Sequence, residues 1–318
     1  MAMVTEAAAV QNSLAPLMAD LAGAVASPAL PDAARATAVQ LLAAQTPLDA
    51  SVTAGSLRSA VQGSGLFLEA GLANALVQPG PVATPDLSSD LKALLLRLTA
   101  DLAPAETDAA AIQAAATEAV PSPVRSPAPS RSAADRPAPP IKGGATAGQP
   151  AAQPAPELEA GGEALIHVLR QGAQAALARV QLSQAASRPE PGAPAHWTFE
   201  TPVATPHGLA IAQFDIRRDG KGADAGSPEA PEPSWRARFS LNVEPSGPVH
   251  ADVSLSAGRA RVTLWAERES ARVSLSAGQG ELAGALATEQ GDDVAVRVIG
   301  GAPPQQAPAA GQLVDRRS

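Results

Sequence analysis

Side chains that could carry out chemistry are few and scattered in this sequence. The chain has 318 residues with four histidines and no cysteine. The histidines are His167, His196, His207 and His250, and no two have the spacing that places two metal ligands on one helical face. Without cysteine, disulfides, thiolate chemistry and cysteine metal sites are excluded. The sequence therefore predicts no metal site and no cofactor.

Two pairs of neighbouring acids and one glycine pair are the remaining candidates for catalysis. Asp292 and Asp293, like Glu267 and Glu269, flank the ends of a predicted helix, where solvated carboxylates are common. Residues 278–280 read Gly-Gln-Gly, without the lysine and hydroxyl residue of a phosphate loop, and no Gly-x-Ser-x-Gly nucleophile motif occurs. We therefore expect a protein that is not an enzyme. An enzyme with a diffuse active site is the alternative that these absences disfavour.

Arginines are concentrated near the strands predicted in the last third of the chain. Arg236 and Arg238 lie two residues apart, so they share one face of a strand. This face is either the solvent side of an antiparallel sheet or a surface for an acidic protein partner. Trp265 lies opposite Val262 and Leu264, which indicates a second packing layer or a binding spot. The other arginines of this cluster are Arg259, Arg261, Arg268 and Arg272.

The stretch from residue 235 to residue 299 has the clearest pattern of regular structure. Apolar and polar residues alternate along it with the period of two that a half-buried strand requires. The alternation predicts strands at 236–243, 249–255, 260–266 and 294–298, with two earlier strands at 197–203 and 209–218. Between the last two strands, residues 269–290 predict a glycine-rich helix that must be stabilised by packing and that ends at Gly291. The predicted fold class is α+β, an antiparallel sheet with one packed helix.

The first half of the chain predicts helices followed by a linker. Helices rich in alanine and leucine are expected at 4–27, 32–45, 56–77, 91–102 and 158–187, and the small apolar faces of the first two predict weak amphipathicity. Prolines crowd the stretch between Pro121 and Pro156, with little apolar bulk between them. Such a segment cannot bury enough apolar surface to offset its ordering entropy, so we expect a disordered linker.

These patterns predict five segments. They are a helical N-terminal region at 1–103, a disordered linker at 104–156, a helix at 157–188, an α+β domain at 189–301 with its core at 235–299, and a flexible tail at 302–318.

Composition limits the class of partner and the location. The net charge of −8 argues against nucleic acid or an anionic membrane as the main partner. The first 27 residues lack the basic start and continuous apolar core of a secretory signal peptide. No run of eighteen apolar residues occurs, so no membrane insertion is expected.

The order of motifs in the last third resembles the C-terminal domain of the flagellar hook-length control protein family, FliK. The pieces are the alternating strand and turn at 239–249, the strand at 262–265, the leucine-bearing helical stretch at 281–286, and Val294-Ala295-Val296. The sequence departs from the family pattern in a turn one residue shorter, in the missing leucine before its glycine, and in the extra glycines of the helix. The resemblance is strong over about a fifth of the chain.

The resemblance implies a function in flagellar assembly. The protein would be made in the cytoplasm and exported through the flagellar type III apparatus, with its N-terminal half and linker measuring the hook in contact with hook or hook-cap proteins. The C-terminal domain would contact the FlhB-like export gate protein and switch export from hook-type to filament-type substrates. As partner-binding residues we predict Arg236, Arg238, Val249, Trp265, Leu282 and Leu286.

A different class of protein shares the same composition. A non-enzymatic scaffold or adaptor would also combine a disordered spacer with an α+β interaction domain, and the sequence leaves this alternative open.

Overall fold

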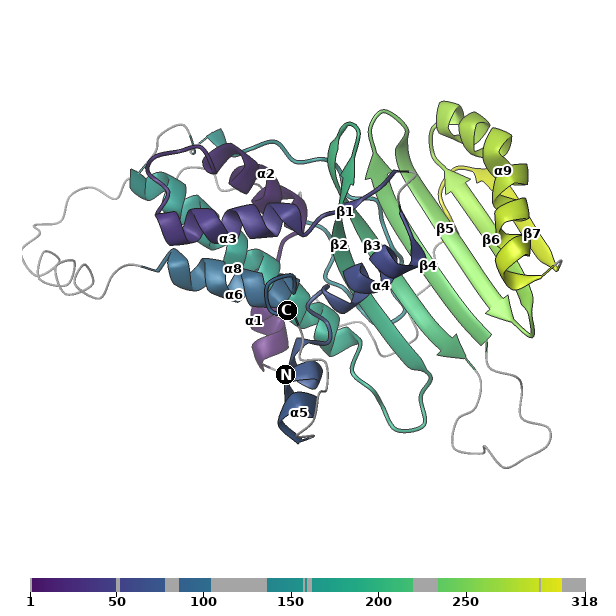
Figure 1. Cartoon of the computed structure of the whole chain (residues 1–318), viewed down its shortest axis with the longest axis horizontal. Coiled ribbons are helices and arrows are strands. Elements are labelled where there is room, and N and C mark those ends of the chain that lie inside the picture. The colour runs from purple at the N-terminus through teal and green to yellow at the C-terminus, as the bar shows by residue number, and fades with distance from the viewer. Residues whose placement is uncertain are drawn as a thin grey trace, which may run out of the picture.

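The computed structural model describes residues 2–49, 52–77, 86–103, 136–156, 158, 162–219, 234–291 and 293–304. The helices predicted in both halves of the chain and the sheet predicted in the second half are present, which confirms the α+β fold class (Figure 1). Residues 104–135 of the predicted linker and residues 305–318 of the predicted tail lie outside the described residues.

The described residues form helices mainly in the first half and strands mainly in the second. The helices are α1 (Ala2–Val10), α2 (Leu14–Ala24), α3 (Asp32–Ala43), α4 (Ala54–Gln62), α5 (Leu68–Val77), α6 (Leu91–Asp101), α8 (Gly162–Ala186) and α9 (Glu269–Gln290). The strands are β1 (Thr46–Pro47), β2 (Ala195–Thr205), β3 (Gly208–Asp219), β4 (Ser234–Val243), β5 (Gly247–Ser256), β6 (Arg259–Ala266) and β7 (Val294–Gly300).

Two of the helices predicted from sequence are each divided in the structure. The predicted helix at 4–27 is α1 and α2, because the Ser13 side chain accepts a hydrogen bond from the Ala15 N–H and starts a new helix. The predicted helix at 56–77 is α4 and α5, separated by a turn in which Gly65 has a φ of 81°. Helix α6 begins at an N-cap, since the Asp90 side chain accepts from the Ala93 N–H at 2.9 Å.

The helical part, residues 2–103 together with α8, has a larger apolar core than its sequence suggests. Leucines of α2, α3, α6 and α8 join one cluster in which Leu21, Leu94 and Leu165 have no exposed surface. The prediction of a small apolar face is therefore wrong for α2. Its buried residues Leu14, Leu17, Met18 and Leu21 recur at helical spacing. The cluster also takes in Ile211 of β3, so it joins the helices to the sheet.

The seven strands form one sheet in chain order, β1 to β7. The pairs from β2 to β6 are antiparallel, as predicted, and the outer pairs β1–β2 and β6–β7 are parallel. Strands β5 and β6 are joined by Ala257-Gly258, whose φ values of 50° and 76° match a tight two-residue hairpin turn between antiparallel strands. The helices other than α9 lie on the β1–β2 side of the molecule (Figure 1).

Helix α9 and strand β7 have the predicted bounds almost unchanged. The helix begins at Glu269 and ends at Gly291, whose φ of 92° suits a glycine C-terminal to a helix. Its leucines Leu275, Leu282 and Leu286 are half-buried against the neighbouring strands, with which α9 is in contact. This packing compensates for the weak helix propensity of its glycines.

Residues 136–156 run without helix or strand except for a short turn at the end, and they contact both the helical part and the sheet. Gln149, in the middle of this stretch, is 5% exposed. This described portion of the predicted linker is thus held against the rest of the molecule.

Candidate partner surface of the sheet

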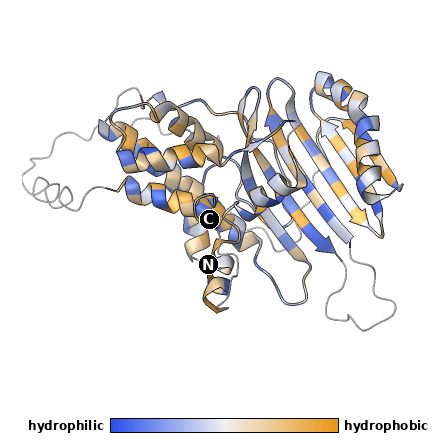
Figure 2. Ribbon diagram, in the orientation of Figure 1, coloured by the Kyte–Doolittle hydropathy of each residue, from blue (hydrophilic) through white to orange (hydrophobic). Residues whose placement is uncertain are grey.

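Apolar and polar residues alternate along the strands, so the two faces of the sheet differ chemically (Figure 2). One face is apolar and carries an aromatic ladder in which Phe199, Phe214 and Phe239 stand side by side, with centroids 5.0 and 5.6 Å apart. On the same face Trp197 and Trp235 stack at 6.0 Å. Helix α9 covers the part of this face that belongs to β6 and β7, because the valines of β7 are half-buried while Ala295 and Arg297 are exposed. Functional polar groups must therefore be sought on the opposite face.

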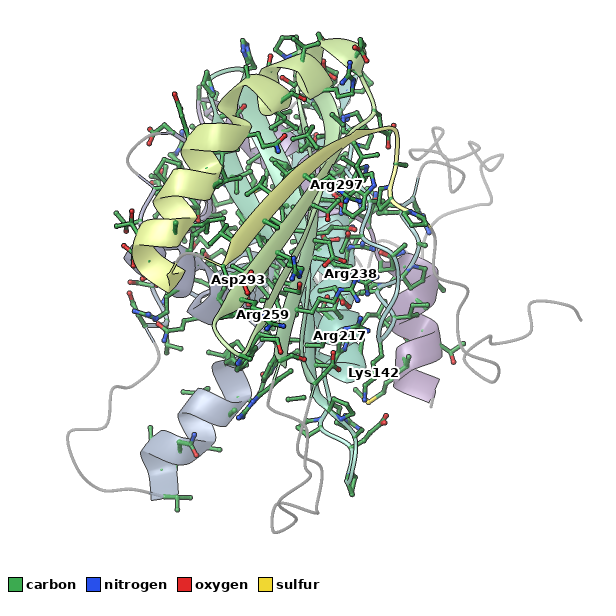
Figure 3. All side chains as sticks on the ribbon, turned by 90° about the vertical axis from the view of Figure 1, so that its right-hand side faces the viewer. Lys142, Arg217, Arg238, Arg259, Asp293 and Arg297 are labelled. Carbon is green, nitrogen blue, oxygen red and sulfur yellow. The ribbon has the colours of Figure 1, made fainter. Side chains whose placement is uncertain are left out.

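Polar side chains on the opposite face are aligned in rows by the strand register. One row crosses the sheet from Glu200 through Gln213, Ser240, His250 and Trp265 to Ile299. The next row contains Thr198, Asp215, Arg238, Asp252, Thr263 and Arg297. Seen from the side, Arg297, Arg238 and Arg217 lie along the face that points away from α9 (Figure 3).

The β2–β4 part of this polar face holds a buried ionic cluster. Asp215, 2% exposed, lies 2.6 Å from His196 Nε2 and accepts from the Arg238 guanidinium at 3.0 Å. Burial raises the pKa of Asp215, but the hydrogen bonds and charges of His196 and Arg238 together outweigh it, so the pKa lies below its ordinary value. Arg238 is thus already neutralised inside the protein. This arrangement favours a structural role for Arg238 over direct contact with a partner.

A serine, a histidine and a glutamate on β4, β5 and the loop after β6 have the order of a hydrolytic triad. Ser240 Oγ lies 2.7 Å from His250 Nδ1, and His250 Nε2 lies 3.1 Å from Glu267 Oε1. Ser240 has no exposed surface, and its hydroxyl lies 2.7 Å from Thr146 Oγ1. A nucleophile must be reachable by its substrate, so in this conformation the three residues form a structural hydrogen-bond chain.

The part of the polar face on β4–β7 is more accessible. Arg236 binds Asp252 through two nitrogens at 2.7 and 2.9 Å, and this carboxylate raises the pKa of the guanidinium. Arg259 pairs with Asp293 at 2.9 Å, and both are exposed (Figure 3). Within the described residues, Arg261 and Arg297 have no carboxylate within salt-bridge distance, and both are exposed.

We call this area the distal polar face. It consists of Arg236, Asp252, Arg261, Thr263, Trp265 and Arg297. The strand register makes Arg261 a diagonal neighbour of Arg297, because Arg261 pairs with Ala295 and Arg297 with Thr263. Half-buried Trp265 lies on the same face, in the cross-strand row next to that of Arg297. Two unpaired cations beside an aromatic ring suit an acidic protein surface.

The six residues predicted to bind a partner are divided between the two faces. Arg236, Arg238 and Trp265 project from the polar face. Val249 lies on the apolar face, and Leu282 and Leu286 are half-buried residues of α9, the helix that packs on this face. Their role in partner binding stays a prediction. Arg297 was absent from the predicted set, although the alternating valines around it already place it on the face away from them.

No group of three or more His, Cys, Asp or Glu that could hold a metal occurs among the described residues. In the same part of the chain, no helix is both long and apolar enough to cross a membrane.

Comparison with known proteins identifies the C-terminal part of the chain. Residues 223–307 match the family model described as flagellar hook-length control protein FliK. This range contains β4, β5, β6, α9 and β7, and hence the whole distal polar face. It confirms the resemblance seen in the sequence. Neither the curated proteins nor the solved structures contain a match to this chain.

Proposed function

We propose that this protein controls flagellar hook length, and that its distal polar face contacts an acidic surface of an FlhB-type export gate protein. The observation that carries the proposal is the family match, whose range contains Arg261 and Arg297, two exposed arginines that lack a carboxylate partner among the described residues. In this proposal the contact switches export from hook-type to filament-type substrates.

The rest of the chain would supply the measurement. The protein would be exported through the flagellar type III apparatus, with its N-terminal half stretched along the growing hook in contact with hook or hook-cap proteins. An extended chain spans at most about 3.3–3.6 Å per residue, so a stretched segment converts residue number into length. Under this mechanism the length of the segment 104–135 matters more than its sequence.

Deletion of residues 235–299 tests the switch. Cells that carry the deletion should have overlong hooks and no filaments, seen by electron microscopy of isolated hooks. Filaments of normal number on the deletion strain would contradict the proposal. The scaffold alternative predicts hooks of normal length.

Insertions within residues 121–135 test the measurement separately. Mean hook length should rise by about 3 Å for each residue added, because the stretched chain gains that contour. A scrambled segment of equal length and composition is the matched control and should leave hook length unchanged. Hook length that stays constant across an insertion series would remove the measuring role while leaving the switch intact.

A further inference from the structure

An irregular segment, residues 136–149, crosses the polar face of β2–β4, and we call it the strap. The Thr146 hydroxyl lies 2.7 Å from that of Ser240, and the Ala147 N–H donates to Gln213 Oε1 at 2.9 Å. The Gln149 amide donates to Glu200 Oε1 at 2.6 Å. The three sheet residues Glu200, Gln213 and Ser240 are consecutive members of one cross-strand row. The strap therefore covers half of the row that continues through His250 to Trp265 on the distal polar face.

The fit of the strap to the sheet is close. A Cβ atom on Gly148 would lie 3.1 Å from the backbone carbonyl of Leu241, so the glycine allows the strap backbone to approach β4. Further back along the strap, the Gly143 N–H lies 3.2 Å from His196 Nε2. The strap is thus held on the sheet by specific polar contacts and by the close approach of its backbone to β4.

The N-terminal residues hold the first part of the strap in place. The Ala9 carbonyl accepts from Arg136 at 2.8 Å, and the Gln11 side chain donates to the Pro137 carbonyl at 2.8 Å. The Ser13 hydroxyl donates to the Gln149 side chain. These contacts join residues separated by more than 120 positions in the chain.

Arg179 of α8 connects Gln11 and the strap to the sheet. Its guanidinium donates to Gln11 Oε1 at 2.6 Å, to the Ala138 carbonyl at 3.0 Å and to Glu200 Oε1 at 2.6 Å. Arg179 is 3% exposed, and Gln11 is equally buried. Removal of Gln11 would leave buried polar groups without partners, which is costly.

We propose that the strap is a release device: when the N-terminal residues are withdrawn, it leaves the sheet and uncovers Gln213 and Ser240 of this row, while Glu200 stays paired with Arg179 of α8. The proposal rests on the proposed function, in which the N-terminal half is pulled away from the C-terminal domain during export. Withdrawal of Ala9, Gln11 and Ser13 removes three anchors of the strap at once. The uncovered part of the row then extends the distal polar face across β4 toward β2. Departure of the N-terminal helices is thereby coupled to a larger partner surface.

Native-state hydrogen exchange of the full-length chain tests the device. The N–H of Ala147 should exchange through the same opening event as the amides of α1, at lower denaturant than the amides of β4 and β5. In Gln11→Ala the Ala147 amide should exchange about tenfold faster, since a buried hydrogen-bond partner is lost, while β5 amides keep their rates. Gln62→Ala, which changes an exposed glutamine of α4, is the matched control and should leave all rates unchanged.

Exchange of Ala147 together with the β4 and β5 amides, in a single opening, would overturn the proposal, because the strap would then be an integral part of the sheet. Equal rates in Gln11→Ala and Gln62→Ala would also overturn it. If Gln11→Ala does not fold, the proposal is still tested in the unmodified chain, by whether Ala147 exchanges in an earlier opening than the β4 and β5 amides. Neither result depends on hook length, so failure of the device is distinguishable from failure of the proposed function.

Discussion

The helical part and the sheet are stabilised in different ways. The large side chains that are fully buried within the described residues belong to the helical part, mainly leucines and Met18, with Ile211 of β3 as the exception in the sheet. The sheet beyond β3 has smaller buried residues such as Ala251, Ala260 and Val262, and it keeps Trp235 42% exposed. Apolar burial is thus concentrated in the helical part, while the matched family domain retains accessible surface. This contrast assigns most of the packing free energy to the first region, and it is consistent with the proposed partner recognition by the second.

The contrast also changes the view of export. A segment with small apolar faces should unfold at little cost, but the proposed export would require the observed leucine cluster to be taken apart before the N-terminal half could enter a channel. In that proposal the helical part presents a free-energy barrier to export. The strap contacts link the removal of this barrier to the state of the sheet.

The largest effect is expected from a substitution in the leucine cluster. Leu94→Ala should reduce the free energy of unfolding by about 2–5 kcal/mol, because it leaves a cavity in a core where Leu94 has no exposed surface. Leu96→Ala on the same helix is the matched control, since Leu96 is 47% exposed, and it should cost far less. Urea unfolding of both variants measures the difference. Equal losses would contradict the assignment of core packing to the helical part.

A smaller effect is expected from the ionic cluster of the sheet, and its dependence on pH is confined to the acid range. The folded-state pKa of Asp215 lies below its ordinary value of 3.8, so its contribution to stability is present above that pH and is lost as the pH falls through the lowered folded value. Asp215→Asn should therefore lower the melting temperature at pH 7 more than at pH 3. Thermal unfolding of Asp215→Asn and of the unmodified protein at pH 7 and at pH 3 measures this difference in melting temperature. A difference in melting temperature that is as large at pH 3 as at pH 7 would show that the charge of Asp215 does not stabilise the cluster.

The smallest effect on stability is expected on the distal polar face. Arg261→Ala and Arg297→Ala should each change the free energy of unfolding by less than about 0.5 kcal/mol, because both side chains are exposed and have no salt-bridge partner among the described residues. Urea unfolding checks this value. A loss of several kcal/mol would indicate that these arginines hold the sheet together, which would weaken the contrast between the two regions.

Local patterns predicted the sheet better than the helical part. The period of two, together with Gly291, was sufficient to predict strands β4 to β7 and the first and last residues of α9. The divisions of the predicted helices were missed because Ser13 and Gly65 act through caps and turns that apolar periodicity does not record. Proline content indicated a linker, but it could not reveal that residues 136–149 lie against the sheet.

The network around Arg179 had no signal in the sequence. Its members Gln11, Gln149 and Glu200 lie far apart in the chain, and each is a residue type that is common on surfaces. Only the three-dimensional structure brings them together. The same is true of the distal polar face, where Arg261 and Arg297 become neighbours through the parallel pairing of β6 and β7.

The central claim is that the distal polar face makes the contact that ends hook growth, and a double charge reversal tests it most directly. The variant Arg261→Glu/Arg297→Glu should fold as stably as the unmodified protein but give overlong hooks without filaments, because the substituted glutamates repel an acidic partner. The matched control Arg58→Glu/Arg188→Glu changes the same charge at exposed positions outside the family match and should give normal hooks. Normal hooks and filaments in the first variant, at normal protein level, would contradict the claim.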